Sequence, residues 1–216
     1  MARNPKAARK LRPRHLMAAS ALIASFALDR PARETRDLMV KAVPRWLLLS
    51  LAHGGDLVIL AAVVATLFAC GLLARRSRLT RAAFVLASAL TATGLVVLSL
   101  KWLASRGADG VFYGFGSGEE GIMFPSGHTA MAFAACAVIG MVWRNFRWPA
   151  WAIAAGVAVS RATLDHFLSD VVAGALVGVL VGRLVTGWAA KKGFVTLDPG
   201  SNAAPATNPA RPPAKR

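Results

Sequence analysis

Charged residues are scarce in this sequence: Asp, Glu, Lys and Arg together make up 17% of its 216 residues. A soluble globular domain normally carries about a quarter, so the composition argues against a soluble enzyme or binding module. Hydrophobic residues reach 56%, mean hydropathy is +0.50, and the apolar residues stand in long blocks without alternation. The sequence therefore predicts an integral membrane protein built as one domain.

Acidic residues are especially few. Ten Asp and Glu stand against 26 Lys and Arg, which gives a formal net charge of +16. The basic residues lie between the apolar blocks rather than on one soluble face, and the sequence contains no nucleic-acid-binding motif. Such a distribution is typical of topology determinants and of contacts with anionic lipid headgroups. We therefore expect membrane lipids, and no nucleic acid, as partners.

Cysteine is almost absent, since Cys70 and Cys136 are the only two. Both lie inside apolar blocks, and their spacing fits neither a disulfide framework nor a metal site. We interpret them as small buried residues of the membrane domain.

Six apolar segments are separated by polar or basic turns. The first, residues 16–28, is too short to cross about 30 Å of hydrocarbon at ~1.5 Å per residue, so it is either a short span or an interfacial segment. We predict an all-α fold, a polytopic transmembrane helical bundle of about six spans. The other predicted spans are residues 56–73, 82–103, 124–143, 148–164 and 167–188.

The two ends of the chain differ in composition from this membrane domain, which we place at residues 16–190. Residues 1–15 form a strongly basic leader. Residues 191–216 are rich in Pro, Ala and Asn, a composition that predicts a disordered tail.

The distribution of Lys and Arg predicts the orientation. Most of them lie in the leader, in the turns at 75–81 and 144–147, and from Arg183 onward. Cytoplasmic segments are enriched in basic residues, so both termini are expected in the cytoplasm. Residues 101–124 and 161–166 then face the opposite side.

The polar residues of that outer side are candidates for chemistry, because ionisable groups at membrane depth are costly without a function. In the segment FPSGHT, Ser126 and Gly127 precede a predicted helix, and free N–H groups at a helix start bind anions such as phosphate. His128 follows on the first turn, where it could exchange a proton with a bound group. The alternative is a capped helix that happens to carry a histidine.

The segment SRATLDHFLSD adds a second group. His166 and Asp170 are four residues apart, so they are expected on one helix face, where the carboxylate would fix the imidazole tautomer. Arg161 offers a planar, permanently charged fork for phosphate oxygens. Lys101 and Arg106 follow the end of another span. Alternatively, His166 and Asp170 tie two helices together and the two cations only reach the membrane interface.

A row of glycines predicts where this group points. Gly174, Gly178 and Gly182 recur at four-residue spacing, which lets a neighbouring helix approach closely. His166 and Asp170 continue the same row, so both are predicted to face the bundle interior. Taken together, two histidines, an aspartate, a serine and several cations suit phosphoryl transfer through a histidine.

The order Lys, Pro-Ser-Gly-His, Ser-Arg and His-x3-Asp resembles the type 2 phosphatidic acid phosphatase (PAP2) family, which is related in fold to vanadium haloperoxidases. That family's pattern is Lys-x6-Arg-Pro, then Pro-Ser-Gly-His, then Ser-Arg-x5-His-x3-Asp. The resemblance covers roughly residues 50–190. The second motif matches fully, and the third matches at both of its ends.

The resemblance implies a role for each candidate residue. His166 would be the nucleophile that forms a phosphohistidine, Asp170 its orienting partner, and His128 the acid for the leaving group. No metal or cofactor is expected. The residues that would bind the phosphate are Lys101, Ser126, Gly127 and Arg161, with Arg106 in place of the arginine of the first motif.

The chain departs from the family pattern in two places. The first motif would place Arg and Pro where Ala108 and Asp109 stand. In the third motif four residues separate Arg161 from His166 rather than five, a change of about 100° on a helix that a loop must absorb. Asp165 also puts a negative charge beside the predicted nucleophile, which disfavours an anionic substrate.

The leading hypothesis is metal-independent hydrolysis of a lipid phosphate or diphosphate at the extracytoplasmic face of a bacterial inner membrane. The departures favour one alternative, a catalytically weakened relative that binds or carries phospholipids. A metal or haem protein that uses His53, His128 and His166 is a further alternative, although the paired helical histidines usual for membrane haem are missing.

Overall fold

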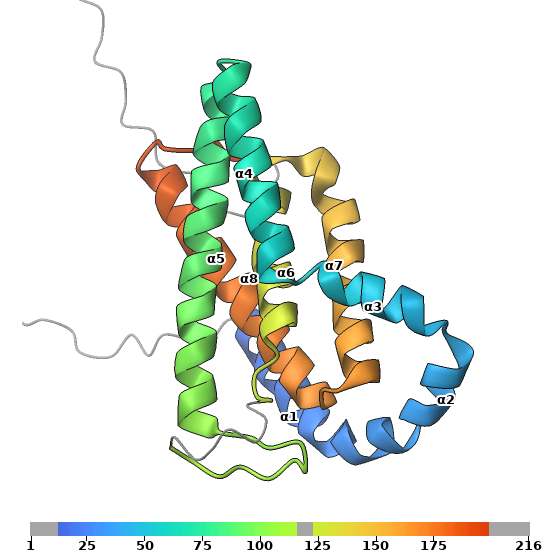
Figure 1. The fold of residues 1–216 in the computed structure, drawn as a ribbon. Helices are drawn as coiled ribbons and strands as arrows, with labels where there is room; N and C mark the ends of the chain where they lie inside the picture. Colours follow the sequence, from blue (N-terminus) through green and yellow to red (C-terminus); the bar gives the residue numbers. More distant parts are fainter. Residues whose placement is uncertain (1–12, 116–122, 199–216) are drawn as a thin grey trace, which may run out of the picture.

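The computed structural model describes residues 13–115 and 123–198 (Figure 1). Within these residues the fold is all-α, as predicted, and an isolated bridge between Arg106 and Phe112 is the only strand-like pairing. A 3-10 turn, Arg144–Phe146, precedes α7. The helices are α1 Pro13–Glu34, α2 Arg36–Ala42, α3 Arg45–His53, α4 Leu57–Leu73, α5 Ser77–Ala104, α6 Gly127–Val142, α7 Arg147–Leu164 and α8 Leu168–Lys191.

Two helices, α5 and α8, are long and apolar enough to cross a membrane by length and composition. The pair α3 and α4 qualifies as a third span if it is taken together, although the two helices meet at a bend of 51°. α6 is a shorter apolar helix. The predicted number of about six spans therefore stays a prediction, whereas the helical bundle itself is confirmed.

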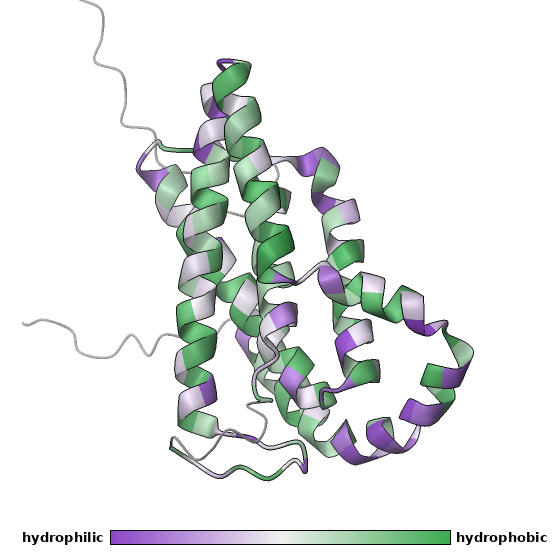
Figure 2. Cartoon of the chain, viewed as in Figure 1, coloured by the Kyte–Doolittle hydropathy of each residue, from purple (hydrophilic) through white to green (hydrophobic). Residues whose placement is uncertain are grey.

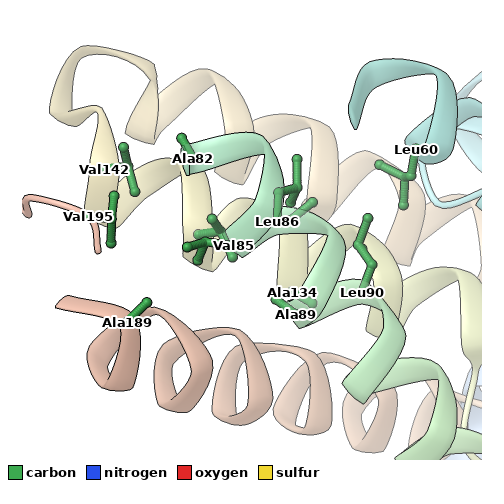
Figure 3. Packing of buried hydrophobic residues seen from close by; sticks show 12 residues of the cluster. Leu60, Ala82, Val85, Leu86, Ala89, Leu90, Ala134, Val142, Ala189 and Val195 are labelled. Carbon is green, nitrogen blue, oxygen red and sulfur yellow. The ribbon is translucent and has the colours of Figure 1, made fainter. Parts of the chain in front are cut away.

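α6 is the central helix of the bundle and packs on α5, α7 and, most extensively, α8. The main hydrophobic cluster is built largely of small side chains (Figure 3). Ala89 from α5 and Ala134 from α6 meet at its centre, beside Leu86, and Val142 and Ala189 extend it toward one end of the bundle. Small residues let the helix backbones approach closely, which is typical of membrane helix packing.

The predicted glycine row lies at the contact between α8 and α6. A Cβ added at Gly178 would lie 2.2 Å from the carbonyl oxygen of Ala130. At Gly174 the corresponding distance, to the oxygen of Ser126, is 2.5 Å, so neither position accepts a side chain without a shift of α6. The prediction that glycines allow close helix approach is confirmed, and this contact sets how near the start of α8 lies to the start of α6.

Apolar side chains cover much of the outside of the helices. Figure 2 shows hydrophobic residues along α4 and α5 and polar residues gathered toward the ends and on α2. Val58 on α4 is 75% exposed and Leu98 on α5 is 64% exposed. An apolar exterior of this kind would be unfavourable in water and is expected for helices in contact with lipid.

The N-terminal region differs most from the sequence-based prediction. α1 continues to Glu34, beyond the predicted end at residue 28, and helices α2 and α3 follow before the predicted span that begins at residue 56. α1 buries Ser25 and Asp29 while Ile23 on the same helix is 72% exposed. The helix continues past the apolar stretch because its polar face, not its apolar face, packs against α8.

The C-terminal tail predicted from residue 191 onward also differs from the structure at its start. Residues 192–198 pack on the bundle: Val195 is 5% exposed, and the Asp198 carboxylate lies 3.4 Å from Arg78 and accepts a hydrogen bond from the backbone N–H of Arg144. The predicted disordered tail therefore does not begin at residue 191. The rest of the predicted tail, 199–216, and residues 1–12 of the predicted leader lie outside the described residues.

Candidate active site

The start of α6 and the start of α8 are joined at the same end of the bundle. The backbone N–H of Ser126 donates to the carbonyl oxygen of Asp170 at 2.9 Å. This bond connects the Pro-Ser-Gly-His segment with the His-x3-Asp segment, which are about forty residues apart in the sequence. The structure thus brings together the two groups of residues that carry the predicted chemistry.

The four-residue spacing predicted that His166 lies on a helix with Asp170. In the structure, His166 lies instead in the turn between α7 and α8. α7 ends at Leu164, and the N–H of His166 donates to the carbonyl oxygen of Arg161 at 2.9 Å. The turn absorbs the shortened spacing of the third motif. His166 Nδ1 still lies 3.5 Å from an Asp170 carboxylate oxygen, and its side chain is 7% exposed.

Asp170 is fully buried on the first turn of α8. One carboxylate oxygen, Oδ2, accepts a hydrogen bond from the Phe167 N–H at 3.0 Å and faces His166, while the other, Oδ1, accepts from Arg106. A carboxylate near a helix start is stabilised by the helix dipole. Asp170 is therefore fixed from two sides and can orient His166.

His128 opens onto the same end of the bundle from the first turn of α6. Its Nε2 lies 4.0 Å from an Asp56 carboxylate oxygen, and both side chains are partly exposed. Arg161 and His166 are also close enough for their charges to act on His128. The two histidines therefore belong to one site.

Asp56 was missing from the sequence-based set of site residues. Its other carboxylate oxygen caps α4 by accepting from the Val58 N–H at 2.7 Å. Gly55 makes this placement possible, because a Cβ there would lie 2.2 Å from the carbonyl oxygen of His128. The Gly-Gly-Asp sequence before an apolar segment could have signalled a capped helix, but it does not reveal the neighbour on α6.

The helix start at Ser126 differs in detail from the prediction. Ser126 is the N-cap of α6, yet its side chain caps no backbone N–H; it accepts from the Thr129 hydroxyl at 3.0 Å and is fully buried. The hydroxyl thus faces protein. Gly127 and His128 are partly exposed, and their backbone N–H groups form no hydrogen bond to a described residue. Open N–H groups at a helix start are able to bind an anion.

Arg161 lies at the end of α7, next to His166. One terminal nitrogen donates to the Asp165 carboxylate at 2.7 Å. Its Nε is buried and has no hydrogen-bond partner. Among the described residues, only this atom and His166 Nδ1 are buried side-chain nitrogen or oxygen atoms without a partner. His166 Nδ1 faces Asp170 at 3.5 Å, so Arg161 Nε is the buried atom that a ligand could satisfy.

Lys101 reaches the site from the last turn of α5. The charges of Asp170 and Arg161 both act on its ammonium group, although these residues lie on other helices. Lys101, Arg161, His128 and His166 therefore converge at one end of the bundle.

Arg106 does not lie in this site as a phosphate ligand, and this part of the interpretation changes. Its side chain is 6% exposed and donates to Asp29, Asp170 and Ser169 at 2.9, 2.7 and 2.7 Å, and to the carbonyl oxygen of Gly110 at 3.1 Å. The ring of Phe167 covers it at 4.1 Å from the centroid. Since protein acceptors take most of its N–H groups, Arg106 holds Asp170 in place instead.

Asp29 is a second residue that sequence reasoning missed. One oxygen accepts from the Ser169 N–H at 2.8 Å, and the other accepts from the Ser169 hydroxyl at 2.6 Å and from Arg106. Asp29 thereby attaches α1 to the start of α8. The available signal was the pair Ser25 and Asp29, two polar residues four apart beside an apolar stretch, which lie on one helix face.

The positions that depart from the family pattern lie in the loop after α5. Asp109 accepts hydrogen bonds from the Tyr113 hydroxyl and from the Val111 N–H. The bond from Tyr113, aided by that from Val111, holds the pKa of the exposed Asp109 carboxyl below its usual value. Asp109 therefore stabilises its own loop and does not point a charge at His166.

The three histidines considered for a metal or haem site are dispersed over different elements. His53 ends α3, whereas His128 opens α6 and His166 precedes α8. In the described parts of the chain, no three His, Cys, Asp or Glu side chains are arranged to hold a metal ion.

Comparison with known proteins agrees with this fold. A structure described as a transmembrane PAP2 type phosphatidylglycerolphosphate phosphatase from Bacillus subtilis superposes with a TM-score of 0.64 and 22% identity, over 82% of this chain and 92% of that one. This likeness shows the fold.

Sequence comparison adds the family. Lipid A 4'-phosphatase from Porphyromonas gingivalis is 34% identical over 76 residues, which are 34% of this chain and 31% of that enzyme, so the match spans only about a third of the relative. The model of the PAP2 superfamily matches residues 82–194, a segment that contains Lys101, His128, His166 and Asp170. Because this segment makes up more than half of the sequence, the chain belongs to the PAP2 superfamily.

Proposed function

We propose that this protein hydrolyses a phosphate or diphosphate ester of a membrane lipid through a phosphohistidine on His166, without a metal ion. The observation that carries the proposal is the pair of buried, unpartnered nitrogens, Arg161 Nε and His166 Nδ1. An unpaired buried polar group costs roughly 1–3 kcal/mol. A phosphate oxygen would satisfy Arg161, and the 3.5 Å contact of His166 with Asp170 would shorten in the substrate complex.

The chemistry follows from which nitrogen of His166 is available. Because Nδ1 faces Asp170, Nε2 is the nitrogen that attacks phosphorus. The bond from phosphorus to the lipid oxygen breaks, and that oxygen takes a proton from His128. Water then attacks the phosphohistidine, gives a proton back to His128, and breaks the phosphorus–nitrogen bond to release inorganic phosphate.

Three sources of positive potential would hold the phosphate oxygens during both steps. Arg161 offers its unpartnered Nε, Lys101 an ammonium group, and the start of α6 the open N–H groups of Gly127 and His128. Such groups stabilise the charge that develops on phosphoryl oxygens in the transition state. They need no movement of the helices that carry them.

A lipid substrate is favoured by the surroundings of the site. The helices that carry it have an apolar exterior, and the site lies where those helices end. Both relatives act on a lipid phosphate according to their names, a lipid A phosphate in one case and phosphatidylglycerolphosphate in the other. Candidate substrates are these two, phosphatidic acid and undecaprenyl diphosphate.

The extracytoplasmic position of the site is part of the proposal. The turn at 75–81, the start of α7 and the end of α8 lie at one end of the bundle, and Asp198 links them through Arg78 and Arg144 (Figure 1). The turn between α7 and α8 lies at the other end. By the positive-inside tendency the basic end is cytoplasmic, which places both termini inside and the site outside a bacterial inner membrane.

The proposed function is tested by phosphate release from these lipid phosphates, with purified protein in neutral detergent. We expect turnover that a chelator such as EDTA leaves unchanged, with a kcat of about 1 s⁻¹ or more on the preferred lipid. Tight binding of lipid phosphates without release of phosphate from any of them would instead support the alternative of a weakened relative.

Replacing Asp165 is expected to strengthen substrate binding. Its carboxylate pairs with Arg161 at 2.7 Å and competes with phosphate for that guanidinium. For Asp165→Asn we expect a KM about two- to fivefold lower, the range that partly exposed ion pairs allow, and a kcat within about twofold of wild type. Initial rates over a range of lipid concentrations measure both constants.

The matched control for this change is Asp198→Asn. Asp198 also pairs with an arginine, Arg78, but at the opposite end of the bundle. The KM of the Asp198→Asn variant should equal that of wild type. A KM that rises in Asp165→Asn would mean that Asp165 orients Arg161 for substrate rather than competing with it.

A further inference from the structure

A pocket beside His166 has a wall that the proposed mechanism does not use. The pocket is open to solvent, and its volume is about 350 Å³ when the solvent space at its mouth is counted. One wall is the turn between α7 and α8, and the other comes from the N-terminal helices. The charged or titratable side chains that line it are Asp29, Arg33, Arg36, Asp165 and His166.

Arg33 is held at the edge of this pocket with donors to spare. One terminal nitrogen donates to the carbonyl oxygen of Ala108 at 3.1 Å, and the guanidinium lies 4.7 Å from the ring centroid of Phe167. Its Nε and other terminal nitrogen form no hydrogen bond to a described residue. Stacking on the ring fixes the plane of the fork and leaves these donors available.

Arg36 is positioned in a similar way one turn further along the chain. Its Nε donates to the carbonyl oxygen of Thr163 at 2.7 Å, three residues before His166. Neither of its terminal nitrogens bonds to the part of the chain that the structure describes. The pocket therefore has two guanidinium groups that the backbone holds by one nitrogen each.

The two arginines and two aspartates that line the pocket are not paired with one another. Asp29 is paired with Arg106, and Asp165 is paired with Arg161. Arg33 and Arg36 form no ion pair with any described carboxylate. Arg33 and Arg36 thus keep guanidinium forks within the pocket, and such forks match phosphate oxygens in geometry as well as in charge.

We propose that Arg33 and Arg36 form a subsite for a second phosphate group, so that the preferred substrate is a lipid diphosphate. The inference rests on the proposed function and extends it. His166 lines the pocket itself, so a phosphate held there would be next to the phosphorus that His166 attacks. Two phosphates joined through one bridging oxygen fit this arrangement.

The subsite would act on the leaving group. His166 Nε2 attacks the terminal phosphorus, the bond from that phosphorus to the bridging oxygen breaks, and the lipid monophosphate departs. Negative charge grows on the departing phosphate, and Arg33 and Arg36 would stabilise it there. A lipid monophosphate has no group to place in the subsite and gains nothing from the two arginines.

The test compares one lipid with one and with two phosphates, dioleoyl phosphatidic acid and dioleoylglycerol diphosphate, in neutral detergent. We expect wild type to favour the diphosphate in kcat/KM by about tenfold or more, because a charge-assisted hydrogen bond is worth at least this factor. Arg33→Ala and Arg36→Ala should each remove most of this preference and leave the monophosphate rate within about twofold. Arg33→Lys should restore it only in part, since the ammonium group lacks the fork.

Arg30→Ala is the matched control, because Arg30 is an exposed arginine of the same helix that does not line the pocket. It should leave the preference unchanged. Equal losses on both lipids in Arg33→Ala, or a wild type without preference, would overturn the subsite. An effect of Arg33→Ala that appears only when phosphatidylglycerol is added would also overturn it, since the ligand would then be a neighbouring headgroup.

A binding measurement separates this proposal from the proposed function. Inorganic pyrophosphate should raise the Tm of wild type more than inorganic phosphate does, and Arg33→Ala and Arg36→Ala should lose that difference. If no lipid is turned over but pyrophosphate still protects through these arginines, the hydrolytic function fails and the subsite stands. If pyrophosphate and phosphate protect equally, the subsite is wrong whatever the turnover.

Discussion

His166→Ala is expected to reduce the rate of phosphate release from lipid substrates by about 10⁴-fold or more, as removal of a catalytic nucleophile does in other hydrolases. The side chain lies between Arg161 and Asp170, 7% exposed, with no hydrogen-bond partner on Nδ1. No other described histidine lies at that position, and His128 on α6 faces Asp56 instead. In the proposed mechanism, loss of the imidazole removes the group that forms the phosphoenzyme.

The measurement combines steady-state rates with trapping of the intermediate. Wild type mixed with a lipid labelled in its terminal phosphate and quenched in base should retain label on the protein, whereas His166→Ala should retain none. His15→Ala is the control, because His15 is an exposed histidine on α1, away from the α7–α8 turn. A rate for His166→Ala within about tenfold of wild type would exclude His166 as the nucleophile.

The convergence of the candidate residues could be predicted because each of them stands next to an apolar segment. The apolar segments place His128 and His166 at the same membrane boundary, and therefore at the same end of the bundle. The glycine row predicts the helix contact, since α8 approaches α6 closely along Gly174, Gly178 and Gly182. Local patterns therefore sufficed for the two histidines and for the helix contact that joins them.

Arg106 was misinterpreted because a cation after a span has the same sequence signature whatever its partner is. The choice between a phosphate and a carboxylate depends on Asp29, which lies 77 residues earlier in the chain. Asp29 itself follows a stretch too short to be assigned as a span with certainty from length alone. A contact between residues this far apart in the sequence produces no periodic pattern in either segment.

Asp56 and Arg33 are two further residues near the site that the sequence patterns could not predict. Asp56 lies 4.0 Å from His128 at the bend of 51° between α3 and α4, and Arg33, near the end of α1, lines the same pocket as His166. Both depend on the path of the chain between helices. The chain between Asp29 and Asp56 thus contributes to both sides of the site.

The buried network of Asp29, Arg106 and Asp170 connects stability with chemistry. Arg106 bridges the two carboxylates, and Asp170 in turn faces His166. The side chains are 10%, 6% and 0% exposed, so water cannot replace a missing partner. A change in α1 is therefore expected to reach the nucleophile through Arg106, without contact between α1 and the substrate phosphate.

Asp29→Ala is expected to destabilise the protein by about 3–5 kcal/mol, because it breaks a buried ion pair and leaves Arg106 without one of its two carboxylates. The change also removes the acceptor of the Ser169 N–H and hydroxyl, and so loosens the start of α8. The free energy of unfolding in detergent, followed by helix loss in a denaturant titration, measures the effect. Turnover of the folded fraction should fall as well, since Asp170 no longer holds His166 from a fixed position.

Asp37→Ala is the control for this prediction, because Asp37 is an exposed carboxylate of the adjoining helix α2 and forms no ion pair with a described residue. It should change the free energy of unfolding by no more than about 0.5 kcal/mol. Asp29→Asn separates charge from shape: it retains an acceptor for Ser169 but not the charge that Arg106 requires. If Asp29→Asn and Asp29→Ala both lose less than about 1 kcal/mol, the network does not stabilise the fold, and the placement of His166 must depend on the α6–α8 contact alone.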